Sequence, residues 1–128
     1  MQTLKARADF LRLRSGQKWA APGLVLQMRA APDPVRPALE AEGVLRVGYT
    51  VTKTVGGAVL RNRAKRRLRA AAAEVLRRDG RAGHDYVLIG RSETLTRPFA
   101  ALTTDLATAI ARVHDGKRGR RRPAEVAT

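Results

Sequence analysis

Three stretches of the chain carry the hydrophobic pattern of β-strands. Residues 23–31, GLVLQMRAA, alternate in part between apolar and other positions, and residues 44–52, VLRVGYTVT, alternate more fully. Residues 86–90, YVLIG, are almost continuously apolar, which is typical of a central strand that is covered on both faces. The pattern therefore predicts a small sheet with residues 86–90 near its centre.

Three further stretches are expected to form helices. The first covers residues 3–14, with Thr3 as its N-cap and Gly16 after its end. The second covers residues 58–78 and the third residues 98–113. Each helix is expected to pack an apolar side on the sheet.

The order of these elements predicts an α/β (α+β) two-layer sandwich. It would contain a small mixed sheet of about four strands and about three helices, in the order α-β-β-(β)-α-β-α. The proline-rich residues 31–43 are expected to be a surface loop. Residues 1–114 would form one domain, and residues 115–128 a basic, disordered tail because they lack apolar periodicity.

The helix expected over residues 58–78 has an apolar side and a basic side. Successive residues of a helix lie about 100° apart, so each side can be read from the sequence. The apolar stripe consists of Leu60, Ala64, Leu68, Ala71 and Val75. The adjoining polar side consists of Arg61, Asn62, Lys65, Arg66 and Arg69, whereas Arg63 and Arg67 fall on a third side.

The charge of the chain indicates a polyanionic partner. Its 128 residues include 26 Lys or Arg against 11 Asp or Glu, which gives a formal net charge of +15. No acid lies between Glu42 and Glu74, an interval that contains eight of the cations. Such a charge favours binding to nucleic acid or to an anionic membrane.

The basic helix carries its charges where an isolated helix would not favour them. Arg61, Lys65 and Arg69 place like charges four residues apart, which destabilises a helix. The cations also lie toward its N-terminal half, where the helix dipole disfavours them. Bound phosphate would offset both effects, and backbone N–H groups after Gly56 and Gly57 could add to the binding. The alternative is an amphipathic helix with a solvated charged side.

The sequence KTVGGAVLRNRAKRRLR, residues 53–69, resembles the signature of the bacterial ribonuclease P protein subunit. Its core, RNRxKRxxR, is matched in order and spacing. The resemblance extends over nearly the whole chain: LKARADFLRL is similar to the opening helix of the family, and GHDYVLIGR to the strand after the basic helix.

The resemblance implies a ribonucleoprotein that removes the 5′ leader of precursor tRNA by endonucleolytic cleavage. In that family the catalytic RNA holds the catalytic Mg²⁺ ions and the protein alone is inactive. The implied fold is a small α/β sandwich with a left-handed βαβ crossover. The implied partners are the catalytic RNA and precursor tRNA, with no membrane and no obligate protein partner.

The resemblance also assigns residues. Those implied to contact the catalytic RNA are Lys53, Arg61, Asn62, Arg63, Lys65, Arg66 and Arg69. Those implied to border the cleft for the leader are Phe10, Leu13, Arg14 and Gln27. The chain departs from the family at Thr54, where a second lysine is usual, and at Arg14 and Gln27, where the family has aromatic residues.

The periodicity of the first helix divides its apolar residues between two sides. Leu4, Ala8 and Leu11 share one side, whereas Phe10 and Leu13 fall on the other. We expect the first set to pack on the core and Phe10 to border the leader cleft. The alternative is that Phe10 packs at the edge of the core.

The residues predict a binding protein rather than a catalytic one. Cysteine is absent, the two histidines, His84 and His114, are far apart in sequence, and no metal-ligand spacing is apparent. We therefore expect no catalytic residue and no metal ligand in the protein itself, and a cytoplasmic location. The alternative function is that of a ribosomal-type RNA-binding protein or RNA chaperone.

Overall fold

The computed structural model describes residues 1–115, which form a five-stranded mixed sheet with helices on both faces. Strands β1, β4 and β5 run parallel to one another, whereas β3 is antiparallel to β5 and β2 to β3. Helix α3 connects the adjacent parallel strands β4 and β5. In sheet order the strands are β1 (Gln2–Thr3), β4 (Arg46–Val51), β5 (His84–Gly90), β3 (Leu24–Ala30) and β2 (Gln17–Ala20).

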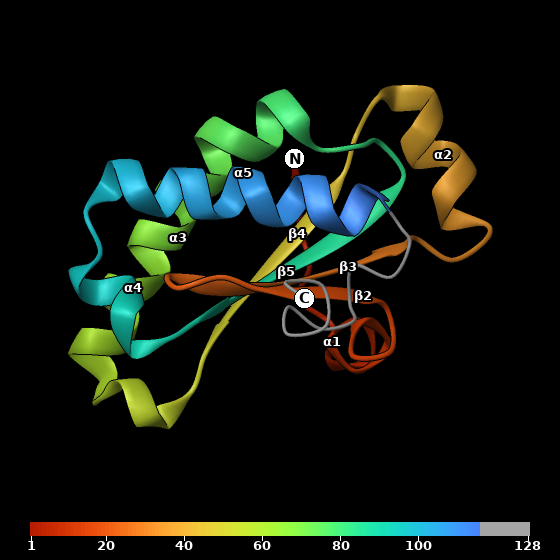
Figure 1. Ribbon diagram of the computed structural model, residues 1–128. Helices are drawn as coiled ribbons and strands as arrows, with labels where there is room; N and C mark the ends of the chain where they lie inside the picture. The colour runs from red at the N-terminus through yellow and green to blue at the C-terminus, as the bar shows by residue number, and fades with distance from the viewer. Residues whose placement is uncertain (116–128) are drawn as a thin grey trace.

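The helices are distributed unequally over the two faces of the sheet. Helices α3 and α5 pack side by side on one face, and α1 lies on the opposite face (Figure 1). A 3-10 turn, Lys53–Val55, joins β4 to α3. The helices are α1 (Arg7–Leu13), α2 (Val35–Glu42), α3 (Ala58–Asp79), α4 (Ser92–Thr96) and α5 (Phe99–Asp115).

Alternation along the strands produces two apolar clusters of different size. Side chains such as Leu26 and Leu88 point toward α3 and α5 and belong to the main core. On the other face, Leu4, Leu13 and Val87 form a small buried cluster beneath α1. Since burial of one large apolar side chain stabilises a fold by roughly 1.5–3 kcal/mol, the small cluster holds α1 far less firmly than the main core holds α3 and α5.

The predicted α/β class is confirmed, with more elements than expected. The sequence predicted about four strands, and the sheet has five because the short segments at Gln2–Thr3 and Gln17–Ala20 pair along its two edges. The residues predicted as a surface loop contain α2. Pro34 is its N-cap and Pro37 lies in its first turn, where backbone N–H groups have no helical partner and proline is tolerated. The tail predicted over 115–128 lies outside the described residues except for Asp115.

The prediction for the first helix was wrong in its start and in its buried side. Thr3 belongs to β1, and the N-cap of α1 is Ala6. Leu4 is buried because its extended backbone donates to the Val47 carbonyl, at 2.9 Å, and not because it shares a helical face with Leu11. Leu11 is 41% exposed. Leu4 was counted as a helical residue although it lies before α1, so it added apolar character to the side of Ala8 and Leu11, which is exposed, and the buried Leu13 was assigned to the other side.

A hydrogen bond between Tyr86 and His114 connects β5 to the end of α5. The Tyr86 hydroxyl accepts the backbone N–H of Arg81 at 2.9 Å and lies 2.7 Å from His114 Nε2. Burial, with a smaller contribution from the charge of Arg81, lowers the pKa of His114 from 6.5 to about 4. His114 is therefore neutral at pH 7 in the folded chain.

We expect the free energy of unfolding to fall as the pH is lowered from about 7 to about 5. The unfolded chain takes up a proton on His114 near its ordinary pKa, whereas the folded chain does so only at lower pH. Urea unfolding at several pH values measures this effect. His114→Gln is expected to flatten the profile, and identical profiles for parent and variant would contradict the assignment.

Candidate nucleic-acid interface

Helix α3 presents its apolar stripe to the sheet and its cations to solvent. Ala64, Leu68, Ala71 and Val75 are buried, as the periodicity predicts. Leu60 is 38% exposed instead. It lies in the first turn of α3, which extends beyond the edge of the sheet at the lower left of Figure 1. The stripe therefore fixes the rotation of the helix and determines which side chains face outward.

The outward residues of α3 and the preceding turn form what we call the α3 basic surface. Arg61 and Lys65 are half-buried, and the other members are exposed. The Arg69 guanidinium lies 5.3 Å from the centroid of the Tyr49 ring, a cation–π contact that orients it. Within residues 1–115, no ion pair involves a member of this surface. Its members are Lys53, Arg61, Asn62, Arg63, Lys65, Arg66 and Arg69.

Arg67 has a different role from its charged neighbours on α3. The sequence placed it on the same side as Arg63, but only Arg63 is exposed. Arg67 donates a hydrogen bond through Nη2 to the backbone carbonyl of Arg97. Arg97 in turn donates to both carboxylate oxygens of Asp105, at 2.7 and 3.0 Å. Arg67 therefore connects α3 to the segment between α4 and α5 and is not part of the α3 basic surface.

A groove of about 510 Å³ lies on the opposite face of the sheet, beside α1. We call it the α1 groove. Helix α1 and the segment before it form one wall, and β3, β4 and β5 form the floor. Its lining consists of Lys5, Arg7, Phe10, Arg14, Gln27, Tyr49, Thr50, Thr52, Val87 and Ile89.

The α1 groove contains three of the four residues predicted for the leader cleft. Phe10, Arg14 and Gln27 line it. The prediction for Leu13 was wrong: its side chain is fully buried in the small cluster beneath α1. It turns toward the sheet because α1 packs through that side.

Two further cations in the groove, Lys5 and Arg7, were missed by the sequence analysis. They lie just before α1 and at its first residue, so their positions depend on where the helix begins. Together with Arg14 they place three cations around the groove, and its lining contains no acid. Such a lining favours an anionic occupant.

Phe10 is the aromatic side chain of the α1 wall. It is half-buried and packs at the edge of the small cluster. A side-chain carbon on Gly48 would lie 2.7 Å from the Phe10 ring, so the absence of a side chain at Gly48 makes room for the ring. Trp19 belongs to the other face of the sheet, where it packs on the main core and lies 5.2 Å from the Arg112 guanidinium. Phe10 thus has both a packing role and access to the groove.

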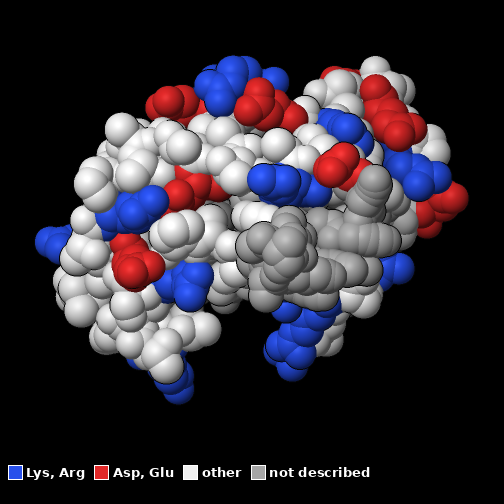
Figure 2. Space-filling view, in the orientation of Figure 1, with Lys and Arg blue, Asp and Glu red and all other residues white. Residues whose placement is uncertain are grey.

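The α1 groove and the α3 basic surface meet at one edge of the molecule. Thr52 lines the groove, and the next residue, Lys53, begins the turn that leads into α3. Figure 2 shows Lys and Arg side chains on both sides of a notch at the lower edge, between the region of α1 and that of the N-terminal end of α3. Acidic side chains gather mainly on the upper side of this view.

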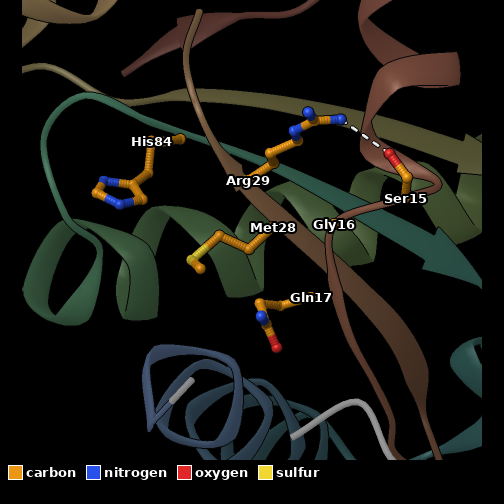
Figure 3. Close-up of a pocket in the computed structure, with 7 residues that line it drawn as sticks. Ser15, Gly16, Gln17, Met28, Arg29 and His84 are labelled. Atoms are coloured by element: carbon orange, nitrogen blue, oxygen red, sulfur yellow. Dashed lines mark hydrogen bonds between the residues drawn. The ribbon is translucent and has the colours of Figure 1, made fainter. Parts of the chain in front are cut away.

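A second hollow lies just after the C-terminal end of α1, between Ser15 and His84 (Figure 3). Arg29 donates from Nη1 to the Ser15 hydroxyl at 2.8 Å and to the Arg12 carbonyl at 3.0 Å. His84 Nδ1 lies 3.0 Å from the Ala82 carbonyl. The serine and the histidine are thus engaged with other partners, and the hollow does not present the hydrogen-bonded pair that an activated nucleophile requires.

The residues that the structure describes do not fit a bound metal ion. Among residues 1–115 there is no group of three or more His, Cys, Asp or Glu side chains placed to hold one. In the same part of the chain, no helix has the length and apolar character needed to cross a membrane.

Comparisons with known proteins agree with this geometry. The family model described as Ribonuclease P matches residues 1–114. A protein named ribonuclease P protein component from Paramagnetospirillum magneticum is 54% identical over 114 residues, covering 88% of this chain and 83% of that protein. One of the same name from Ruegeria pomeroyi is 48% identical over 118 residues, covering 91% and 90%.

Solved structures show the same fold. The RNase P protein of Staphylococcus aureus aligns with a TM-score of 0.66 and 25% identity, over 88% of this chain and 97% of that one. The RNase P protein of Thermotoga maritima aligns with a TM-score of 0.63 and 26% identity, over 84% and 94%. With the family model spanning the whole α/β fold, the α3 basic surface and the α1 groove, the chain belongs to the ribonuclease P protein component family.

Proposed function

We propose that the α3 basic surface binds the catalytic RNA and that the α1 groove binds the 5′ leader of precursor tRNA. The family assignment makes the chain the protein subunit of ribonuclease P, the endoribonuclease that matures the 5′ end of tRNA. The alternative of a ribosomal-type RNA-binding protein or chaperone accounts for the charge but not for the family match. The proposed location is the cytoplasm.

The observation that carries this proposal is the meeting of the two surfaces at Thr52 and Lys53. A substrate strand in the groove would lie next to an RNA bound along α3. The protein could then hold the leader beside the catalytic RNA without contributing a reacting group. Such positioning lowers the activation free energy of cleavage, because the substrate has already lost translational and rotational entropy when it is bound.

We propose different recognition chemistry for the two surfaces. Arg61, Lys65, Arg69 and their neighbours would neutralise phosphates of a structured RNA. In the groove, Phe10 would stack on a base, Lys5, Arg7 and Arg14 would contact leader phosphates, and the Gln27 amide would offer a donor and an acceptor. Because Arg14 and Gln27 stand where the family has aromatic residues, leader binding should depend more on charge than on stacking.

The protein is proposed to leave metal binding to the RNA. Among the described residues, no cluster of three or more His, Cys, Asp or Glu side chains is placed to hold Mg²⁺. The role of the protein would be to supply fixed cations where free counterions would otherwise be needed.

Affinity measurements on the reconstituted holoenzyme test the leader assignment. We expect precursor tRNA to bind more tightly than mature tRNA, and we expect this preference to shrink when the catalytic RNA is used without the protein. Equal preference with and without the protein would contradict a leader site in the groove.

A further inference from the structure

The buried carboxylate of Asp85 connects α1 to the sheet through two arginines. Asp85 lies in β5 and is fully buried. Arg46 of β4 donates to both of its oxygens, from Nε to Oδ1 and from Nη2 to Oδ2, each at 2.8 Å. Arg12 of α1 donates to Oδ2 of the same carboxylate. We call Asp9, Arg12, Arg46 and Asp85 the Asp85 network.

The network contains two carboxylates and two guanidinium groups, so its formal charges cancel. One pair, Arg46 and Asp85, lies on the sheet, and the other, Asp9 and Arg12, lies on α1. Arg46 and Asp85 are register neighbours on adjacent strands, so the sheet itself holds this bidentate pair in place. Arg12 and Asp9 belong to α1, and their side chains are joined at 3.1 Å. Arg12 also donates to the Ala30 carbonyl at the end of β3, at 3.2 Å. Arg12 is therefore the α1 side chain that reaches both Asp85 of β5 and the end of β3. Two weaker or backbone links accompany it: Asp9 lies 3.8 Å from Arg46 of β4, and Arg29 of β3 donates to the Arg12 carbonyl.

Beyond these polar contacts, the apolar attachment of α1 is slight. The helix has only seven residues, and its apolar support is the small cluster around Leu13. Phe10 and Arg14, which line the groove, project from the same short helix as Arg12. A shift of α1 would therefore move the groove wall relative to its floor on β3, β4 and β5.

We propose that Asp85 is a positioning residue for the α1 groove: through Arg12 it sets the distance between the groove wall and the sheet, and thereby the fit of the single-stranded leader. Asp85 does not line the groove, so it would act on the leader through Arg12 and not by direct contact. The inference rests on the proposed binding of the leader in the groove. It adds that recognition depends on a buried ion-pair network on the other side of α1.

The principal test variant is Arg12→Gln, which detaches α1 from Asp85 and leaves the Arg46–Asp85 pair intact. Asp85→Asn is the second variant, but it leaves two arginines without their carboxylate and can prevent folding. Asp105→Asn is the matched control. Asp105 is also a buried carboxylate, 7% exposed, that pairs with an arginine, but it lies on the α5 side of the sheet.

Holoenzyme affinities for precursor and mature tRNA measure the effect on recognition. We expect Arg12→Gln to lower the preference for precursor on the order of tenfold, because stacking on Phe10 and the contacts of Arg14 both depend on the position of α1. Affinity for mature tRNA and for the catalytic RNA should be unchanged, since α3 lies on the opposite face. Asp105→Asn should retain the precursor preference.

The position of α1 can be measured without any RNA. The chain contains no cysteine, so Leu11→Cys on α1 and Ala73→Cys on α3, both exposed positions, provide a unique pair for spin labels. We expect a narrow distribution of distances between the two labels when the chain carries only the two cysteine substitutions, and also when Asp105→Asn is added. We expect a broader distribution when Arg12→Gln is added.

The two proposals fail in different ways. If Arg12→Gln retains the full precursor preference, the role of Asp85 is overturned, whether or not the distance distribution broadens. If the distribution stays narrow in Arg12→Gln, the proposed attachment is likewise overturned. If the unmodified holoenzyme shows no protein-dependent preference for precursor, leader binding in the groove is contradicted. The role of Asp85 in recognition is then contradicted as well. In that case the spin-label distances still show whether the network positions α1.

Discussion

Replacing Arg61, Lys65 and Arg69 together by alanine is expected to reduce binding of the catalytic RNA and its dependence on salt. Each lost phosphate contact lowers the slope of log affinity against log salt by up to about one unit, so the triple variant should lose up to about three. Folding should survive, because the apolar stripe of α3 is unchanged and repulsion between like charges is removed. Titration of labelled RNA at several salt concentrations measures the slope.

A triple variant at the C-terminal end of α3 and just beyond it provides the control. Arg77, Arg78 and Arg81 are exposed, and their replacement by alanine removes the same formal charge. Because these residues lie outside the α3 basic surface, we expect a much smaller change in slope. Equal slopes for the two triple variants would show that only net charge matters and that the α3 basic surface is not the binding site.

Replacing Phe10 by alanine is expected to affect precursor binding and stability together. Loss of one stacked base should weaken the affinity for precursor by roughly 1–3 kcal/mol and leave mature tRNA unaffected. Because Phe10 is only half-buried, the loss of folding stability should be smaller than the roughly 3–5 kcal/mol typical of a fully buried phenylalanine. Thermal unfolding and holoenzyme affinities for both RNAs measure the two effects.

The other phenylalanine of the chain serves as the control. Phe99 is 39% exposed at the start of α5 and lies outside the α1 groove. Phe99→Ala should leave the preference for precursor unchanged. A large loss of stability in Phe10→Ala with equal effects on both RNAs would assign Phe10 to the core alone.

Long periodic segments were predictable from the sequence, and short ones were not. Helix α3 was expected over residues 58–78 and spans Ala58–Asp79, because a stripe repeated over many turns leaves one rotation of the helix possible. Helix α2 was missed because its prolines resemble those of a loop, although proline is compatible with a first turn. Strand β1 has two residues, too few for any alternation to be visible.

The candidate site was predictable where it depends on one element, and less so where several elements meet. The residues of the α3 basic surface follow from the angles of one helix and from the family signature. The α1 groove depends on where α1 begins and which way it turns, so Leu13 was placed wrongly and Lys5 and Arg7 were missed. The pairing of Arg12 with Asp85 joins residues 73 positions apart, and no local pattern records such a contact.

The most direct test of the account is cleavage of precursor tRNA by the protein reconstituted with a catalytic ribonuclease P RNA at low Mg²⁺. The account predicts that the holoenzyme releases the 5′ leader at Mg²⁺ concentrations where the RNA alone is slow, and that the rigorously RNA-free protein cuts nothing. Cleavage by the protein without RNA, or an unchanged Mg²⁺ requirement in the holoenzyme, would contradict the account.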